Sequence, residues 1–68
     1  NWGSPAAVPA LSAALADSEP LIRGHAAWAL GRIGGRAARE ALLSSAPVEQ
    51  EAWVQEEIGL ALSAPDTA

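Results

Sequence analysis

The stretch RGHAAWALGRIGG, residues 23–35, decides the fold of this protein. Within it and just before it, apolar residues recur at intervals of four, three and four, at Ile22, Ala26, Ala29 and Ile33. Leu30 widens this stripe to the width that a helix needs when one face packs into a core. Gly34 and Gly35 then supply the left-handed backbone that commonly ends a helix. The pattern predicts one amphipathic helix that ends at the glycine pair.

Capping residues and prolines bound the neighbouring helices. Ser4, followed by a proline, is a helix-start signal. Because Pro9 has no N–H to donate, it should bend or delay the helix expected over residues 5–15. Ser18 or Glu19 is expected to cap the next helix. Two further helices are predicted over residues 36–46 and 50–62, and the last has these expected core residues: Trp53, Val54, Ile58, Ala61 and Leu62.

Two segments repeat at a fixed spacing. LIRGHAAWAL, residues 21–30, aligns with WVQEEIGLAL, residues 53–62, at an offset of 32, and PAL at 9–11 aligns with EAL at 40–42 at an offset of 31. Such a period with two helices per unit is typical of α-solenoids. The sequence therefore predicts an all-α fold, an alpha-alpha superhelix of two helical hairpins and four helices.

The repeat also sets the expected domain organisation. Residues 4–35 form repeat one, residues 36–63 form repeat two, residues 1–3 end a preceding truncated repeat, and residues 64–68 are a C-terminal tail. Solenoid repeats bury apolar faces against their neighbours, and about three are usually needed for stability. We therefore expect exposed apolar surface on this chain to favour self-association.

Composition excludes several kinds of site. The chain has no cysteine, so it offers no disulfide, thiolate ligand or thiol nucleophile. No phosphate-binding loop, nucleophile elbow or zinc-ligand spacing occurs. Four carboxylates lack a second ligand type nearby and are predicted to form a solvated acidic cap: Glu49, Glu51, Glu56 and Glu57. We predict no catalytic, cofactor-binding or metal-binding residue in this chain.

Charge and hydropathy narrow the expected partners. The net charge of −4 argues against general nucleic-acid affinity, yet all four arginines fall within residues 23–39, which contain no acid. No run approaches the roughly 18 consecutive apolar residues of a membrane span, and no signal peptide is visible. We expect a cytoplasmic protein with no membrane contact.

The segment ADSEPLIRGHAAWALGRIG resembles the short HEAT repeat of the bilin-lyase type. The residues that match that unit are Asp17, Ile22, Arg23, Ala26, Ala27, Ala29, Leu30, Gly31, Ile33 and Gly34. The resemblance implies structural roles for Asp17, Arg23, Gly31 and Gly34, with the Asp and Arg forming a ladder between adjacent units. Arg23 is expected to pair with Asp17 or with a carboxylate of an adjacent repeat. Since Glu49 and Gln55 stand where Asp17 and Arg23 stand, repeat two is predicted to lack the ladder and to be a terminal cap.

A narrower resemblance rests on three segments, NWGSPAAVPAL, RGHAAWALGRIG and VQEEIGLAL. Together they are similar to the C-terminal HEAT region of the epoxyqueuosine reductase family, a family of iron–sulfur cluster-binding proteins. The resemblance implies a parent oxidoreductase that completes queuosine in tRNA with cobalamin and two four-iron clusters. Its catalytic residues would all lie upstream. This chain would be a non-enzymatic module that packs on the upstream domain and helps to position tRNA.

A second stripe marks the candidate contact surface. His25, Trp28 and Arg32 follow Leu21 at intervals of four, three and four, roughly 90° from the core stripe. One interpretation has Leu21 and Trp28 packing against a neighbouring repeat, and the other makes His25, Trp28 and Arg32 a docking surface for RNA or the catalytic domain. Nearby, a low ridge could receive another backbone: Gly24, Ala27 and Gly31.

Arg36 and Arg39 complete the candidate tRNA contacts. They open the third helix, where the helix dipole disfavours positive charge, so they either contact an anionic partner or are simply solvated. The alternative function is a generic HEAT-repeat scaffold that binds a protein, or a bilin-lyase-like subunit.

Overall fold

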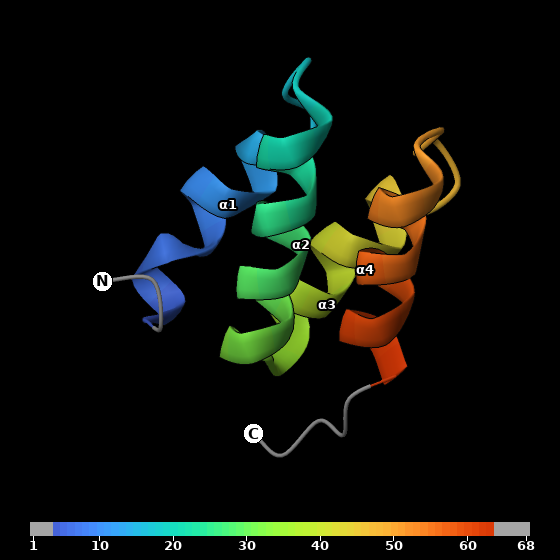
Figure 1. Ribbon diagram of the computed structural model, residues 1–68. Coiled ribbons are helices and arrows are strands. Elements are labelled where there is room, and N and C mark those ends of the chain that lie inside the picture. Colours follow the sequence, from blue (N-terminus) through green and yellow to red (C-terminus); the bar gives the residue numbers. More distant parts are fainter. Residues whose placement is uncertain (1–3, 64–68) are drawn as a thin grey trace.

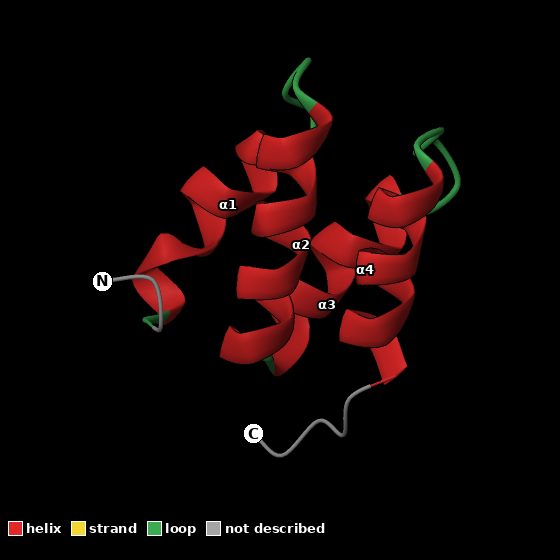
Figure 2. Cartoon of the chain, in the orientation of Figure 1, coloured by secondary structure: helices red, strands yellow, loops and turns green. Residues whose placement is uncertain are grey.

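The computed structural model describes residues 4–63, and these residues form helices joined by short connections (Figures 1 and 2). A 3-10 turn and four α-helices follow one another: η1 Pro5–Ala7, α1 Val8–Ala14, α2 Pro20–Ile33, α3 Gly35–Ser45 and α4 Ala52–Ser63. No strand occurs among the described residues. The predicted all-α architecture with four helices is confirmed.

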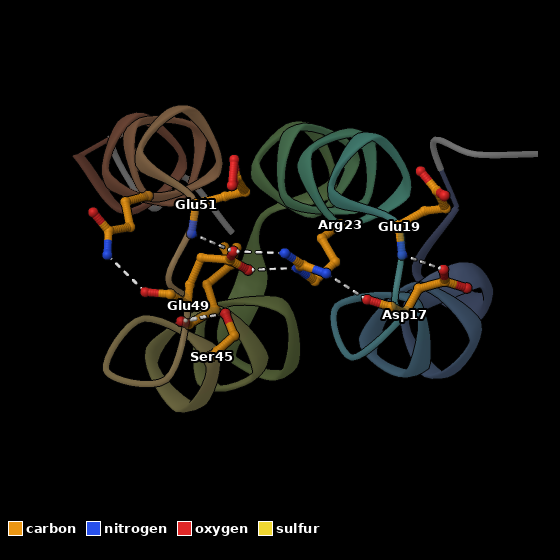
Figure 3. A network of polar contacts seen from close by, with 8 residues as sticks. Asp17, Glu19, Arg23, Ser45, Glu49 and Glu51 are labelled. Carbon is orange, nitrogen blue, oxygen red and sulfur yellow. Dashed lines mark hydrogen bonds and ion pairs between the residues drawn. The ribbon is translucent and has the colours of Figure 1, made fainter.

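The helices lie in two layers. α2 and α4 run side by side in one layer, and α1 and α3 form the layer behind them (Figures 1 and 3). α2 is the central element, because it packs against α1, α3 and α4. The α1–α2 and α3–α4 connections lie at one end of the molecule, whereas the α2–α3 junction and the last turn of α4 lie at the other end (Figure 1). This division into two ends positions the charged side chains described below.

Local chemistry explains where the first helices begin. The Ser4 hydroxyl accepts a hydrogen bond from the Ala6 N–H at 3.2 Å, as predicted for a capping residue. The chain then makes a 3-10 turn, and α1 begins only at Val8, so the delay expected from Pro9 is confirmed. Glu19 occupies the N-cap position of α2, one of the two predicted, but its side chain makes no capping hydrogen bond, and Asp17 Oδ1 instead accepts the Glu19 N–H at 2.9 Å.

The α2–α3 junction is built on the predicted glycine pair. Gly34 and Gly35 have φ values of 71° and 87°, and the Gly34 N–H donates to the Leu30 carbonyl at 3.0 Å. Nothing lies within 4 Å of a Cβ built on either glycine, so the requirement for glycine is one of backbone conformation rather than space. α3 therefore follows α2 almost without a loop.

The core lies between the two layers and consists of small and branched aliphatic side chains. Its buried residues are Val8, Leu11, Leu15, Ala26, Ala27, Ala29, Leu30, Ala38, Leu42, Val54 and Ile58. Of the residues that the sequence pattern placed in the core, Ile33, Ala61 and Leu62 are only partly buried, and two are exposed. Ile22 is 43% exposed and Trp53 is 38% exposed. A periodic stripe shows which side of a helix is apolar, but it does not show whether another element covers that side.

The low ridge on α2 receives α4. The indole ring of Trp53 lies against Gly24, so closely that a Cβ at Gly24 would collide with it. Two turns further along, a Cβ at Gly31 would lie 2.7 Å from Ala61 Cβ and 3.0 Å from Ala61 Cα. The two glycines allow α2 and α4 to approach closely, which identifies the backbone that the sequence left open.

Candidate functional site

A polar network crosses the end of the molecule that carries the two hairpin connections (Figure 3). Arg23 donates from Nε to Glu49 Oε1 at 2.8 Å, from Nη2 to Glu49 Oε2 at 3.1 Å, and from Nη1 to the Asp17 carbonyl at 2.7 Å. The Arg23 guanidinium thus donates two parallel hydrogen bonds to the Glu49 carboxylate of the second hairpin, and a third to the backbone of the α1–α2 connection. Arg23 pairs with a carboxylate of the adjacent repeat, as predicted.

The prediction that Glu49 breaks the ladder and belongs to a solvated cap is wrong. Glu49 is 7% exposed, and its Oε2 accepts the Glu51 N–H at 3.0 Å, just as Asp17 accepts the Glu19 N–H. Glutamate is one methylene longer than aspartate, and this side chain reaches both its own helix start and the guanidinium of Arg23. Glu49 therefore fills the ladder position that sequence reasoning considered vacant.

Gln55 makes the same contact to the backbone as Arg23 does, but it makes no ion pair. Its Nε2 donates to the Glu49 carbonyl at 2.6 Å, as Arg23 does to the Asp17 carbonyl. It carries no charge, so it offers no ion pair of its own.

Proton equilibria in this network follow its geometry. The hydrogen bonds from Arg23 lower the pKa of Glu49, outweighing the effect of burial, and the bond to Glu49 raises the pKa of Arg23 above its ordinary value. Both side chains are therefore held charged. The buried Ser45 hydroxyl is also satisfied, since it donates to the Leu42 carbonyl at 3.0 Å. The network is structural, because every group in it is engaged within the chain.

The three remaining arginines gather at the opposite end, and we call this surface the arginine edge. Arg32 lies in the last turn of α2, and Arg36 and Arg39 lie in the first two turns of α3. All three are exposed. Arg39 Nη1 donates to the Leu62 carbonyl at 3.1 Å, which ties the start of α3 to the end of α4. The arginine edge lies away from the two connections that carry the acidic network (Figure 1).

His25 and Trp28 line a groove on the helix layer, apart from Arg36 and Arg39. Its volume is about 710 Å³, and it crosses α2 from α1 to α4. The part between α2 and α4 is lined by His25, Trp28, Trp53 and Glu57, and we call this part the front groove. Arg32 joins the two surfaces, because its guanidinium carbon lies 5.4 Å from the centre of the Trp28 ring.

The five candidate contacts therefore fall on two surfaces rather than one. His25 and Trp28 lie in the front groove, whereas the three arginines form the edge. Sequence reasoning missed Trp53, which it assigned to the core, and Glu57, which it assigned to a solvated cap. The signal that could have found Glu57 is the offset of 32, which aligns it with His25.

The described residues limit the chemistry that these surfaces offer. Within residues 4–63, no group of three or more His, Asp or Glu side chains could hold a metal ion. Across the same residues, no helix is both long and apolar enough to cross a membrane. The arrangement offers aromatic faces, apolar surface and exposed charge, which are the elements of a binding surface.

Comparisons with known proteins agree with this architecture. A family model described as HEAT repeats matches residues 1–63. The chain is also similar to a protein named epoxyqueuosine reductase from Listeria monocytogenes, with 48% identity over 42 residues. That match covers 62% of this chain and 11% of the reductase. No solved structure matches significantly. With two helical hairpins joined by an arginine–carboxylate contact and a family match over nearly its whole length, the chain belongs to the HEAT repeat family.

Proposed function

We propose that this HEAT-repeat unit is a non-catalytic module that positions tRNA within a longer, epoxyqueuosine reductase-like protein. The observation that carries the proposal is the arginine edge. Three exposed cations lie at the α2–α3 junction of an acidic chain, while Asp17, Glu19, Glu49 and Glu51 lie at the two hairpin connections (Figure 3), which Figure 1 places at the other end of the molecule. An edge with three exposed cations can contact phosphates although the net charge is −4 and the exposed Glu40 follows Arg39 on α3.

The position of Arg36 supports an anionic partner. It lies in the first turn of α3, where the helix dipole disfavours a positive charge. Arg32 has the opposite setting, because it lies in the last turn of α2, where the dipole favours it. Arg36 therefore contributes little to the stability of its own helix, and binding phosphate is a role that its position allows.

The reductase part of the proposal concerns the rest of the longer protein. Four-iron clusters are held by cysteine thiolates, and this chain has no cysteine. Its residues do not fit such a cluster, so we assign no redox step to it. Cluster and cobalamin binding would belong to the remainder of the protein. A visible absorption spectrum of the intact, anaerobically purified protein tests this part, since a colourless protein would contradict it.

Salt-dependent binding tests the arginine edge. In the intact protein, replacing Arg32, Arg36 and Arg39 together by alanine should weaken tRNA binding and reduce the magnitude of the salt slope by about two to three, since each phosphate contact contributes roughly 0.9. The matched control replaces the same residues by lysine, which keeps the charge and should keep the slope. Unchanged affinity in the alanine variant would refute RNA positioning by this edge.

A further inference from the structure

The front groove has an internal order that the RNA proposal does not use. At the offset of 32, His25 of α2 corresponds to Glu57 of α4, and Trp28 corresponds to Leu60. Along α4 the order is Trp53, then Glu57, then Leu60. Trp28 is 56% exposed and Leu60 is 66% exposed. Among the lining residues, His25 and Glu57 thus lie between Trp53 at one end and Trp28 at the other, and Leu60 continues the same side of α4 beyond the lining.

Stacking of repeats leaves this surface open. α4 packs beside α2 by placing Trp53 and Ala61 on Gly24 and Gly31. Contact between units therefore uses the flanks of the helices within one layer. Trp28 remains 56% exposed although α4 is already packed next to α2, so the α2–α4 contact leaves this face available to a partner.

The charge of the groove selects that partner. Among the described residues that line the groove, Glu57 is the only Asp, Glu, Lys or Arg side chain. A carboxylate disfavours phosphate and favours a cation, and the neighbouring indole of Trp53 adds an aromatic surface that a cation can contact. The mostly aliphatic and aromatic lining needs apolar groups on either side of that cation.

We propose that the front groove binds an amphipathic helix of a protein partner that carries one basic side chain between two apolar ones. Trp53 and Leu60 are seven residues apart, which is about 10.5 Å along a helix. A partner helix lying along the valley between α2 and α4 has the same rise. It therefore presents apolar residues at i and i+7, with lysine or arginine at i+3 or i+4 opposite Glu57.

A second copy of this chain does not meet the requirement. None of its four arginines has large apolar residues on both sides at either spacing, four positions before and three after it or three before and four after it. Arg32 follows Trp28 but precedes Gly35, and Arg39 precedes Leu42 but follows Gly35. The partner helix therefore lies outside these 68 residues.

The test uses the 68-residue chain and a fluorescently labelled, alanine-based helical peptide of about 16 residues. The first peptide carries leucine at i and i+7 and lysine at i+4. A second peptide has glutamate in place of the lysine, and a third has alanine in place of both leucines. Fluorescence anisotropy should show the lysine peptide binding about fivefold more tightly than the glutamate peptide, near the upper limit for an exposed ion pair. The alanine peptide should bind at least about tenfold more weakly than the lysine peptide.

Charge reversal at Glu57 tests whether the basic residue of the peptide is recognised at this position or is attracted by the net charge of the protein. Glu57→Lys should reverse the preference, so that the glutamate peptide binds more tightly. The matched control Glu56→Lys makes the same change in net charge at an exposed position outside the groove and should leave the preference unchanged. Trp28→Ala should weaken the lysine peptide at least about fivefold, whereas Leu43→Ala, an exposed position on α3, should not. Circular dichroism confirms that each variant is folded.

Several results would overturn the proposal. They are the absence of saturable binding, equal affinity for the lysine and glutamate peptides, and an unchanged preference in Glu57→Lys. An RNA stem-loop whose binding is weakened by Trp28→Ala as much as by loss of the three arginines would place RNA in the groove instead. Retained peptide binding in the three-arginine variant keeps this proposal distinct from RNA positioning.

Discussion

The close approach of α2 and α4 makes opposite predictions for two glycine-to-alanine substitutions. Gly31 and Gly59 both lie inside helices, where alanine is preferred by about 0.5–1 kcal/mol. At Gly59 nothing lies within 4 Å of the added methyl group. At Gly31 the methyl group would lie 3.0 Å from Ala61 Cα, so part of the neighbouring helix backbone has to move.

The magnitudes follow from these contacts. Gly59→Ala should raise the free energy of unfolding by about 0.5–1 kcal/mol, because it gains helix propensity and meets no neighbour. Overpacking typically costs about 1–3 kcal/mol. After the gain in helix propensity is subtracted, Gly31→Ala should lower the free energy of unfolding by about 1 kcal/mol. For a domain of this size, 1 kcal/mol corresponds to a shift in Tm of about 4–8 °C.

Urea and thermal unfolding, followed by circular dichroism, measure both variants. A double-mutant cycle with Ala61→Gly assigns the cost, since removing the facing methyl group should give Gly31→Ala and Ala61→Gly a favourable coupling of about 1 kcal/mol. If Gly31→Ala stabilises the chain as much as Gly59→Ala does, the reasoning about the α2–α4 contact is refuted.

Three further substitutions test the polar network, the junction and the core. Glu49→Gln should lower the free energy of unfolding at pH 7. Because the pKa of Glu49 is lowered in the folded state, its contribution is present above the ordinary glutamate pKa of about 4.3 and is lost as the pH falls through the folded-state pKa. A difference in stability between the two proteins that does not change with pH, measured by urea unfolding, would contradict this. Gly34→Ala should lower the free energy of unfolding by about 1–2 kcal/mol because of its φ of 71°, and an unchanged Tm would argue against a backbone requirement. Leu30→Ala should cost about 2–5 kcal/mol, because Leu30 is fully buried, and a loss below about 1 kcal/mol in urea unfolding would show that the site collapses around the smaller side chain.

Much of the backbone arrangement could be predicted from the sequence because its signals are local. The cap at Ser4, the delay at Pro9 and the turn at Gly34 depend on groups within a few residues of each other. The ridge at Gly24 and Gly31 was also visible, since two missing side chains on one face permit a close neighbour. What covered the ridge could not be read locally, because the neighbour lies about 30 residues further along the chain.

The candidate site was harder to predict, for reasons of side-chain reach. Glu49 was interpreted as the loss of an aspartate, although its extra methylene lets it bind both Arg23 and the start of α4. Trp53 counted as core because it is large and apolar, but its ring lies on a glycine and is partly exposed on the front of the helix layer. Periodicity places a residue on a face of a helix, and it does not measure how far the side chain extends.

The Arg23–Glu49 contact also gives the two hairpins a direction. Hairpin one presents the Asp17 carboxylate together with the Arg23 guanidinium, whereas hairpin two presents the Glu49 carboxylate together with the neutral amide of Gln55. If the hairpins were treated as exchangeable modules, copies of the first joined head to tail would place the Arg23 guanidinium of one copy beside the Asp17 carboxylate of the next. A copy of the first placed after the second would set an amide against Asp17. Arg23 in the first hairpin and Gln55 at the equivalent position of the second thus determine which order of hairpins places a cation beside the next carboxylate. Longer arrays designed from this sequence should keep the arginine in every hairpin except the last.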